Sequence, residues 1–267
     1  MKTPSFPWLI GALALCAAGI QAAEPKPIGD QLQRRSGAAY MSPGLQAMQA
    51  DASLNPGMLW VKQGADLWQT VPQGTDQAKA TCASCHGDAP SSMRGVAARY
   101  PAFDEQLKQP INLGQRINQC RIKHQQLKPL KLESPDLLAL ESFVAYQSRG
   151  MVLAPPQDER LSAYVERGHQ RFDQRMGQIN LSCAQCHDER AGLRLGGNLI
   201  PQAHPTGYPV YRLEWQGLGS LQRRLRNCIN GVRAQLYPMG APELLELELF
   251  LARRAQGMAL ESPGVRP

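Results

Sequence analysis

The chain has 267 residues, 43% hydrophobic and 19% charged, which suits one or two folded domains and excludes disordered and fibrous proteins. Twenty-nine lysines and arginines against 22 acidic residues give a net charge of +7, so an anionic partner is expected. Only 6% of the residues are aromatic, which argues against stacking surfaces for single-stranded nucleic acid, and no nucleic-acid partner is expected.

The first 23 residues predict a signal peptide. Lys2 precedes an apolar run over residues 8–20, and the small residues Ala22 and Ala23 offer a cleavage site. The run is too short for a good membrane span and no later segment is apolar enough, so no membrane span is expected. Cleavage removes Cys16, in a context that suits lipoprotein processing poorly, and six cysteines remain in an oxidising compartment.

Residues 24–60 are rich in Ala, Gly, Gln and Pro and predict an N-terminal extension packed across one module. The six remaining cysteines begin after this extension. Their even number would ordinarily indicate disulfides, but their spacing indicates a different chemistry.

Two C-x-x-C-H runs predict the attachment of two c-type haems. In such a run the two thiols bond covalently to one porphyrin, and the histidine that follows binds its iron. A zinc site would need further ligand pairs nearby, and a thioredoxin-like motif would need a βαβ pattern that is absent. The predicted haem-binding residues are Cys82, Cys85, His86, Cys183, Cys186 and His187.

The haem motifs belong to a longer internal repeat. Residues 61–64 resemble 165–168, residues 116–120 resemble 224–228, and residues 143–151 resemble 250–258. The chain is therefore expected to be mainly α, with two cytochrome c-like haem modules in tandem after the extension. The predicted bounds are 61–152 for the first module and 158–258 for the second, which carries the active site, with a linker at 152–158 and a tail at 259–267.

A helix is predicted near the end of each module. Ser134 suits an N-cap, Pro135 suits the first helical position, and Leu137, Leu140 and Val144 recur at helical spacing before Gly150. In the second module Pro242 opens the helix, Leu244, Leu247 and Leu251 line one face, and Gly257 closes it. No sustained strand pattern appears.

Two lone cysteines, Cys120 and Cys228, occupy equivalent positions of the repeat. A sixth iron ligand in each module explains the duplication, since cysteine thiolate is an established iron ligand. A disulfide between the two is the alternative. Other residues that could bind the iron are Met93, Met151, Met239, His124, His169 and His204.

Arginines crowd the second lone cysteine. If this segment is helical, Arg224 lies on the same face as Cys228, four residues away. Arg223, Arg226 and Arg233 are close in sequence, and some of these arginines are expected to pair with haem propionates or to face solvent. An anion site beside a sulfur nucleophile is the functional interpretation, because arginine binds oxyanions through a fixed fork of donors and favours thiolate.

Two C-x-x-C-H motifs, each followed by a lone cysteine, with R-L-R-N-C in the second module, resemble the SoxA subunit of SoxAX cytochromes over residues 61–258. The resemblance implies a periplasmic L-cysteine S-thiosulfotransferase that works with a SoxX-type cytochrome and loads thiosulfate onto a cysteine of the SoxYZ carrier protein. Many relatives lack the first haem motif, which this chain keeps.

The resemblance also implies roles for individual residues. His86 and Cys120 would bind the first iron, and His187 and Cys228 the second. Cys228 would be the catalytic sulfur, found as a persulfide in the family, and Arg224 would bind the thiosulfate oxyanion. Two alternatives remain open at this point: a thiosulfate dehydrogenase that forms tetrathionate, and a plain di-haem electron-transfer cytochrome.

Overall fold

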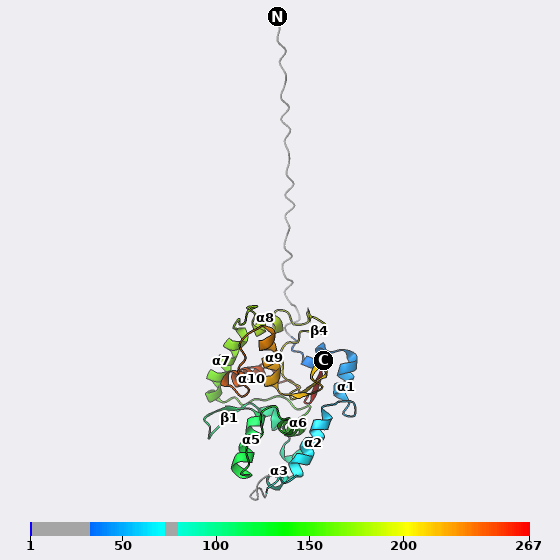
Figure 1. Ribbon diagram of the computed structural model, residues 1–267, viewed down its shortest axis with the longest axis vertical. Helices are drawn as coiled ribbons and strands as arrows, with labels where there is room; N and C mark the ends of the chain where they lie inside the picture. The colour runs from blue at the N-terminus through cyan, green and yellow to red at the C-terminus, as the bar shows by residue number, and fades with distance from the viewer. Residues whose placement is uncertain (2–32, 73–79) are drawn as a thin grey trace. The chain divides into compact units, whose positions relative to one another are not determined.

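The computed structural model describes residues 1, 33–72 and 80–267. The predicted signal peptide, apart from Met1, and the cysteine within it lie outside these residues. Residues 34–267 form one compact unit (Figure 1). In the part of the chain that the structure describes, no helix is long and apolar enough to cross a membrane.

Helices dominate the described residues, as the sequence predicts. The α-helices are α1 (Pro43–Ala50), α2 (Met58–Gln69), α3 (Cys82–His86), α4 (Ala89–Ser92), α5 (Leu113–His124), α6 (Pro135–Tyr146), α7 (Ser162–Asp173), α8 (Cys183–His187), α9 (Leu221–Gly231) and α10 (Pro242–Arg254). The 3-10 helices are η1 (Gly37–Tyr40), η2 (Ala97–Arg99), η3 (Glu159–Leu161) and η4 (Leu213–Trp215).

The last helix of each half begins where the capping residues predict. The first half is residues 61–152 and the second half is residues 158–258. In α6 the Ser134 hydroxyl accepts a hydrogen bond from the Leu137 N–H and Pro135 takes the first turn, and α10 likewise opens on Pro242. Gly150 and Gly257 follow these helices with φ of 80° and 88°, a conformation that favours glycine.

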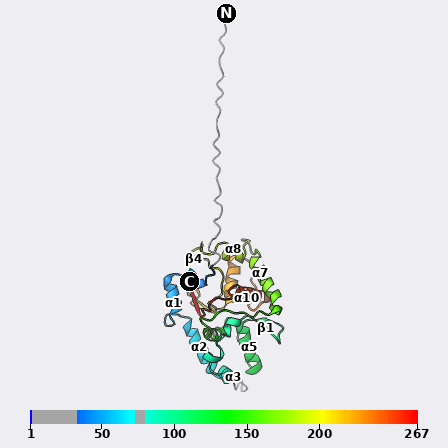
Figure 2. The same ribbon diagram turned by 180° about the vertical axis from the view of Figure 1, so that it is seen from behind.

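Each of these helices crosses an earlier helix of its own half at a glycine. A Cβ added to Gly64 of α2 would lie 2.2 Å from the Ala139 carbonyl oxygen of α6. A Cβ added to Gly168 of α7 would lie 2.1 Å from the Glu246 carbonyl oxygen of α10. Figures 1 and 2 show both helix pairs side by side from opposite directions. The same close crossing therefore recurs in the two halves.

Short strands, which the sequence pattern does not predict, precede and follow these helices. They are β1 (Ala102–Asp104), β2 (Gln109–Ile111), β3 (Arg194–Leu195), β4 (Asn198–Leu199), β5 (Val210–Arg212), β6 (Gly217–Gly219) and β7 (Gly264–Arg266). β1 pairs with β2 and β3 with β4, both antiparallel, and β5 lies between antiparallel β6 and parallel β7. Strands of two or three residues are too short to show alternation in a sequence.

The C-terminal residues are a structural strand, although the sequence suggested a tail. Val265 of β7 is fully buried and pairs with Tyr211 of β5. The backbone N–H of Val265 donates to the side-chain oxygen of Gln49, at 3.0 Å, so the end of the chain is also tied to helix α1 of the extension.

The N-terminal extension contacts both halves, although its sequence predicts packing across one module. Leu45 and Met48 of α1 pack into an apolar cluster that contains Leu138 of α6 and Leu218 of β6. Burial of these side chains supplies the hydrophobic free energy that fixes the extension in place. The extension therefore joins the two halves of the unit.

Candidate functional site

The first C-x-x-C-H motif forms the one-turn helix α3. The Thr81 hydroxyl accepts the Ser84 N–H at 2.9 Å and so begins the helix at Cys82. Trp68 of α2 lies beside the motif, with its ring centre 5.7 Å from that of His86 and its Nε1–H donating to the Gly87 carbonyl at 3.1 Å. One helical turn thus presents both thiols and the histidine of this motif from a single rigid element.

The second motif forms the equivalent helix α8. A capping box between Ser182 and Gln185 begins it, because each side chain accepts the backbone N–H of the other. The Nδ1 atom of His187 lies 2.6 Å from the carbonyl oxygen of Pro201. A proton on Nδ1 leaves Nε2 as the lone-pair nitrogen that can bind iron.

The lone cysteines lie on equivalent helices, Cys120 on α5 and Cys228 on α9, as the repeat predicts. All six cysteines of the described residues are free, so the alternative of a Cys120–Cys228 disulfide is not present in the structure. Cys120 is electrostatically coupled to Cys82 and Cys85, and Cys228 to Cys183. Each lone cysteine therefore lies with the motif of its own half.

The two lone thiols have opposite electrostatic surroundings. Burial raises the pKa of Cys120, and nearby Arg116 opposes this only in part. Burial also acts to raise the pKa of Cys228, but a hydrogen bond with His187 and the charge of Arg224 outweigh it and lower the pKa overall. Thiolate is thus favoured at the second lone cysteine.

Arg224 lies four residues before Cys228 on α9, on the same helix face. Its equivalent in the first half is Arg116, which donates to the Asp104 carboxylate at 2.7 Å and to the Tyr100 hydroxyl at 3.2 Å. For Arg224 the structure describes no hydrogen bond or ion pair of the guanidinium with any residue from 33–72 or 80–267. Its charge is therefore available to an anion.

The alternative histidine ligands are engaged or face solvent. His169 stacks on Phe250 with ring centres 4.8 Å apart, the Nδ1 of His204 lies 2.7 Å from the Arg35 carbonyl oxygen, and His124 is exposed.

The alternative methionine ligands divide between three places. Met239 lines a cavity away from both motifs, Met151 approaches Gly95, and Met93 packs in the same apolar cluster as Cys82. Cys228 is the residue that the structure places against His187.

These donor sets fit c-type haem. A histidine nitrogen and a cysteine sulfur from one half are enough for haem iron, because the porphyrin supplies the other four ligands. A structural zinc ion needs four ligands from side chains. Within residues 33–72 and 80–267, no three histidine, cysteine or acidic side chains gather as a metal site.

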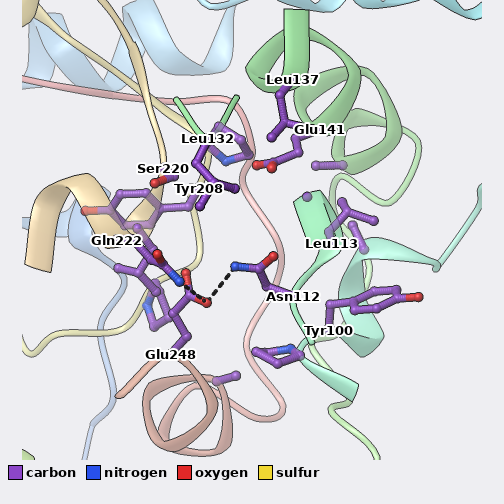
Figure 3. A pocket seen from close by; sticks show the side chains of 18 of the residues that line it. Tyr100, Asn112, Leu113, Leu132, Leu137, Glu141, Tyr208, Ser220, Gln222 and Glu248 are labelled. Atoms are coloured by element: carbon purple, nitrogen blue, oxygen red, sulfur yellow. Dashed lines mark hydrogen bonds between the residues drawn. The ribbon is translucent and has the colours of Figure 1, made fainter. Parts of the chain in front are cut away.

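A separate cavity of about 140 Å³ lies where the two halves meet, lined by residues from both (Figure 3). It holds the carboxyls of Glu141 and Glu248, each the seventh residue of its helix, α6 or α10. The Asn112 amide donates to Glu248 at 2.9 Å, across the seam. Burial raises the pKa of Glu141 to about 8 and that of Glu248 to about 7. Of the residues that the sequence suggested as iron ligands or site residues, Met239 lines this cavity, whereas the cysteines, the motif histidines and Arg224 do not.

Several residues around the site were not predicted from the sequence. Pro201 contacts His187 through a backbone carbonyl, which no side-chain pattern reveals. Trp68 is an ordinary apolar position in its helix. Asp104 and its counterpart Arg212 could have been found by extending the repeat upstream, where Tyr-Pro-Ala-Phe-Asp corresponds to Tyr-Pro-Val-Tyr-Arg.

Comparison with known proteins places this arrangement among relatives of known activity. The profile of the family described as SoxA/TsdA, cytochrome c domain, matches residues 63–153. The L-cysteine S-thiosulfotransferase subunit SoxA of Pseudaminobacter salicylatoxidans is 37% identical over 232 residues, which cover 86% of this chain and 80% of that protein. The corresponding subunit of Rhodovulum sulfidophilum is 32% identical over 92% of this chain and 85% of its own length.

A solved structure agrees with these relatives. The crystal structure of SoxXA from P. pantotrophus matches with a TM-score of 0.83 and 29% identity, over 88% of this chain and 87% of the matched chain. The similarity extends well beyond the cytochrome c domain of the family profile.

Proposed function

The chain belongs to the family of L-cysteine S-thiosulfotransferase subunits named SoxA, and we propose that Cys228 and Arg224 form its active site. The carrying observation is the cysteine whose thiolate is favoured beside an arginine whose guanidinium makes no hydrogen bond or ion pair with any described residue. Thiosulfate is a dianion with one nucleophilic sulfur, and this pair of side chains offers a sulfur and a positive charge in one place.

Two c-type haems are part of the proposal. The thiols of Cys82 and Cys85 would hold the first and those of Cys183 and Cys186 the second. The axial ligands would be His86 and Cys120 for the first iron, and His187 and Cys228 for the second. When bound, the haem supplies an electron acceptor within the protein.

The net reaction joins thiosulfate to a carrier cysteine. The S–H bond of the carrier thiol breaks, an S–S bond forms to the outer sulfur of thiosulfate, and one proton and two electrons are released. Arg224 would hold the sulfonate oxygens, which orients the outer sulfur toward the carrier and offsets the charge that two approaching anions bring together. Cys228 would provide the catalytic sulfur at which thiosulfate and the carrier cysteine come together.

The proposed partners follow from the family. A SoxX-type cytochrome would bind the chain, as the name of the SoxXA structure says of that complex. The SoxYZ carrier would supply the cysteine that accepts thiosulfate. The predicted signal peptide would direct the chain to the periplasm.

Incubation of the haem-loaded chain with thiosulfate and carrier, with and without its partner cytochrome, tests this function. We expect a carrier-bound thiosulfonate, detected by intact mass, together with haem reduction. Tetrathionate formed equally well without carrier would indicate a thiosulfate dehydrogenase, and electron transfer without either product would indicate a plain cytochrome.

Arg224→Ala should raise the KM for thiosulfate about 10–100-fold, because a hydrogen bond to a charged group is lost. Arg116→Ala is the matched control, since that guanidinium is already paired with Asp104, and its KM should stay within about twofold. Haem content is measured in both variants. Unchanged kinetics in Arg224→Ala would remove this residue from the site.

A further inference from the structure

The segment before the lone cysteine is similar in the two halves, but one of its positions carries opposite charges in them. Asp104 at the end of β1 and Arg212 at the end of β5 each lie 16 residues before the lone cysteine of their half. Each also follows a Tyr-Pro pair by the same interval. The position is thus an acid in one half and a base in the other.

In the first half this position closes an ion pair. Asp104 is 2% exposed and accepts the Arg116 guanidinium at 2.7 Å, together with the N–H groups of Gln106 at 3.0 Å and Leu107 at 2.7 Å. Arg116 also donates to Gln119 at 3.2 Å. No charge in this arrangement is left for a ligand.

In the second half the same position adds a second positive charge. Arg212 is 8% exposed, and its charge and that of Arg224 act on each other and on Cys228. Its Nε lies 2.9 Å from a carboxylate oxygen of Glu214, but the buried N–H makes no hydrogen bond of acceptable geometry with any described residue. Glu214 itself is 48% exposed, so solvent screens its charge.

Other arginines near this site are already engaged. Arg266 pairs with Glu261 at 3.7 Å, and Arg223 lies over the Trp215 ring at 4.1 Å. Arg224 makes no ion pair with any described residue, and the only ion pair that Arg212 makes with a described residue is with the half-exposed Glu214. Two desolvated like charges cost free energy unless an anion compensates them.

We propose that Arg212 and Arg224 together bind the sulfonate group of thiosulfate beside Cys228, an inference that rests on the proposed function. Two forked donors can satisfy several oxygens of one tetrahedral anion, and their summed charge matches that of the dianion. In the first half Asp104 occupies the place of the second arginine. The charge reversal thus confines the anion site to one half of an otherwise repeated structure.

The carboxylates of haem propionates are anions that the same two arginines could bind. The test therefore separates binding of haem propionate from binding of thiosulfate. Arg212→Gln is prepared in the haem-loaded chain with its partner cytochrome, with Arg212→Lys as a charge-retaining variant and Arg116→Gln as the matched control. The measurements are the KM for thiosulfate, the inhibition constant of sulfate as an inert dianion, the haem content and the reduction potentials.

We expect Arg212→Gln to raise both the KM and the sulfate inhibition constant at least about tenfold, with haem content and potentials unchanged. Arg212→Lys should restore part of this loss, and Arg116→Gln should match the wild type. Unchanged anion affinity in Arg212→Gln, with or without a shift in haem content or potential, would overturn the inference.

Failure of the proposed function gives a different pattern. In that case the wild-type complex does not transfer thiosulfate to the carrier. Sulfate binding, measured by calorimetry, still tests whether Arg212 and Arg224 bind an anion. Loss of sulfate binding in Arg212→Gln would support the anion site even then. Equal sulfate binding in the wild type and this variant would reject it.

Discussion

Cys120 and Cys228 are equivalent in sequence, yet only the second lies in surroundings suited to anion chemistry. Burial raises the pKa of the Cys120 thiol, while His187 and Arg224 lower that of Cys228 against the effect of burial. The two halves share the same arrangement of helices, and the difference comes from individual side chains. We therefore expect the function of the two halves to differ at the scale of individual residues.

Substitution of the two lone cysteines tests this asymmetry. Cys228→Ser should abolish loading of the carrier, because the proposed reacting sulfur is lost. Cys120→Ser should retain at least about half of the wild-type rate, because the anion site in its half is closed by Asp104. Intact mass of the carrier reports the product, and the haem content confirms that haem is attached in both variants. Equal loss of loading in the two variants would contradict the assignment.

At the scale of elements, two glycine crossings hold the helix pairs. Gly64 meets the backbone of α6 and Gly168 meets that of α10, in each case with a phenylalanine side chain, Phe143 or Phe250, also within 3 Å of the added Cβ. Backbone cannot move aside as a flexible side chain can. The short α3 and α8 helices depend on these pairs, because Trp68 of α2 and Phe172 of α7 lie beside His86 and His187.

Gly64→Ala and Gly168→Ala should each lower the free energy of unfolding by about 1–3 kcal/mol, as overpacked positions do. Gly44→Ala on α1 is the control, since nothing lies within 4 Å of its added Cβ. A gain of about 0.5–1 kcal/mol is expected there from helix propensity. Guanidinium unfolding of the haem-loaded chain, followed by circular dichroism, measures all three. Stability unchanged by both crossing variants would show that the helices are not in contact at these glycines.

At the scale of the whole molecule, the two halves meet around buried carboxyls. Glu248 accepts hydrogen bonds from Asn112 of the first half and from Gln222 of its own half at 3.3 Å. Glu133 of the first half accepts the N–H of Ser220 at 3.3 Å and so contacts the start of α9. The pKa of this carboxyl is also raised, by burial. The seam thus has a polar and acidic part beside the apolar cluster that contains Leu138 and Leu218.

This seam makes stability depend on pH. Glu141 and Glu248 are protonated in the folded protein up to pH about 8 and about 7, whereas their ordinary pKa is 4.5. Between these values the folded state binds more protons than the unfolded state, so the free energy of unfolding falls as the pH rises. The slope is at most about 1.4 kcal/mol per pH unit for each carboxyl.

Glu141→Gln and Glu248→Gln should flatten this decline, because an amide does not ionise. Unfolding of the haem-loaded chain at about pH 5.5 and about pH 8.5 measures the slope. Glu166→Gln, an exposed carboxyl on α7, is the control and should keep the wild-type slope. A wild-type protein whose stability does not fall between these two pH values would contradict the raised pKa values.

The haem motifs, the lone cysteines, the repeat and the capped helices α6 and α10 could be predicted from the sequence, because each depends on residues close together in the chain. Motif spacing and helix capping are local properties. The resemblance to the SoxA family, confirmed by comparison, rested on the same local patterns. The roles of Cys228 and Arg224 remain predictions that the variants above test.

Tertiary structure decided which charges meet. The ion pair of Arg116 with Asp104, the mutual repulsion of the Arg212 and Arg224 charges, and the carboxyls at the seam all join residues distant in sequence. The short strands and the contacts of α1 with both halves likewise depend on pairing between remote segments. A sequence lists these side chains, but the free energy of a charge depends on its burial and its neighbours, and only the folded chain determines both.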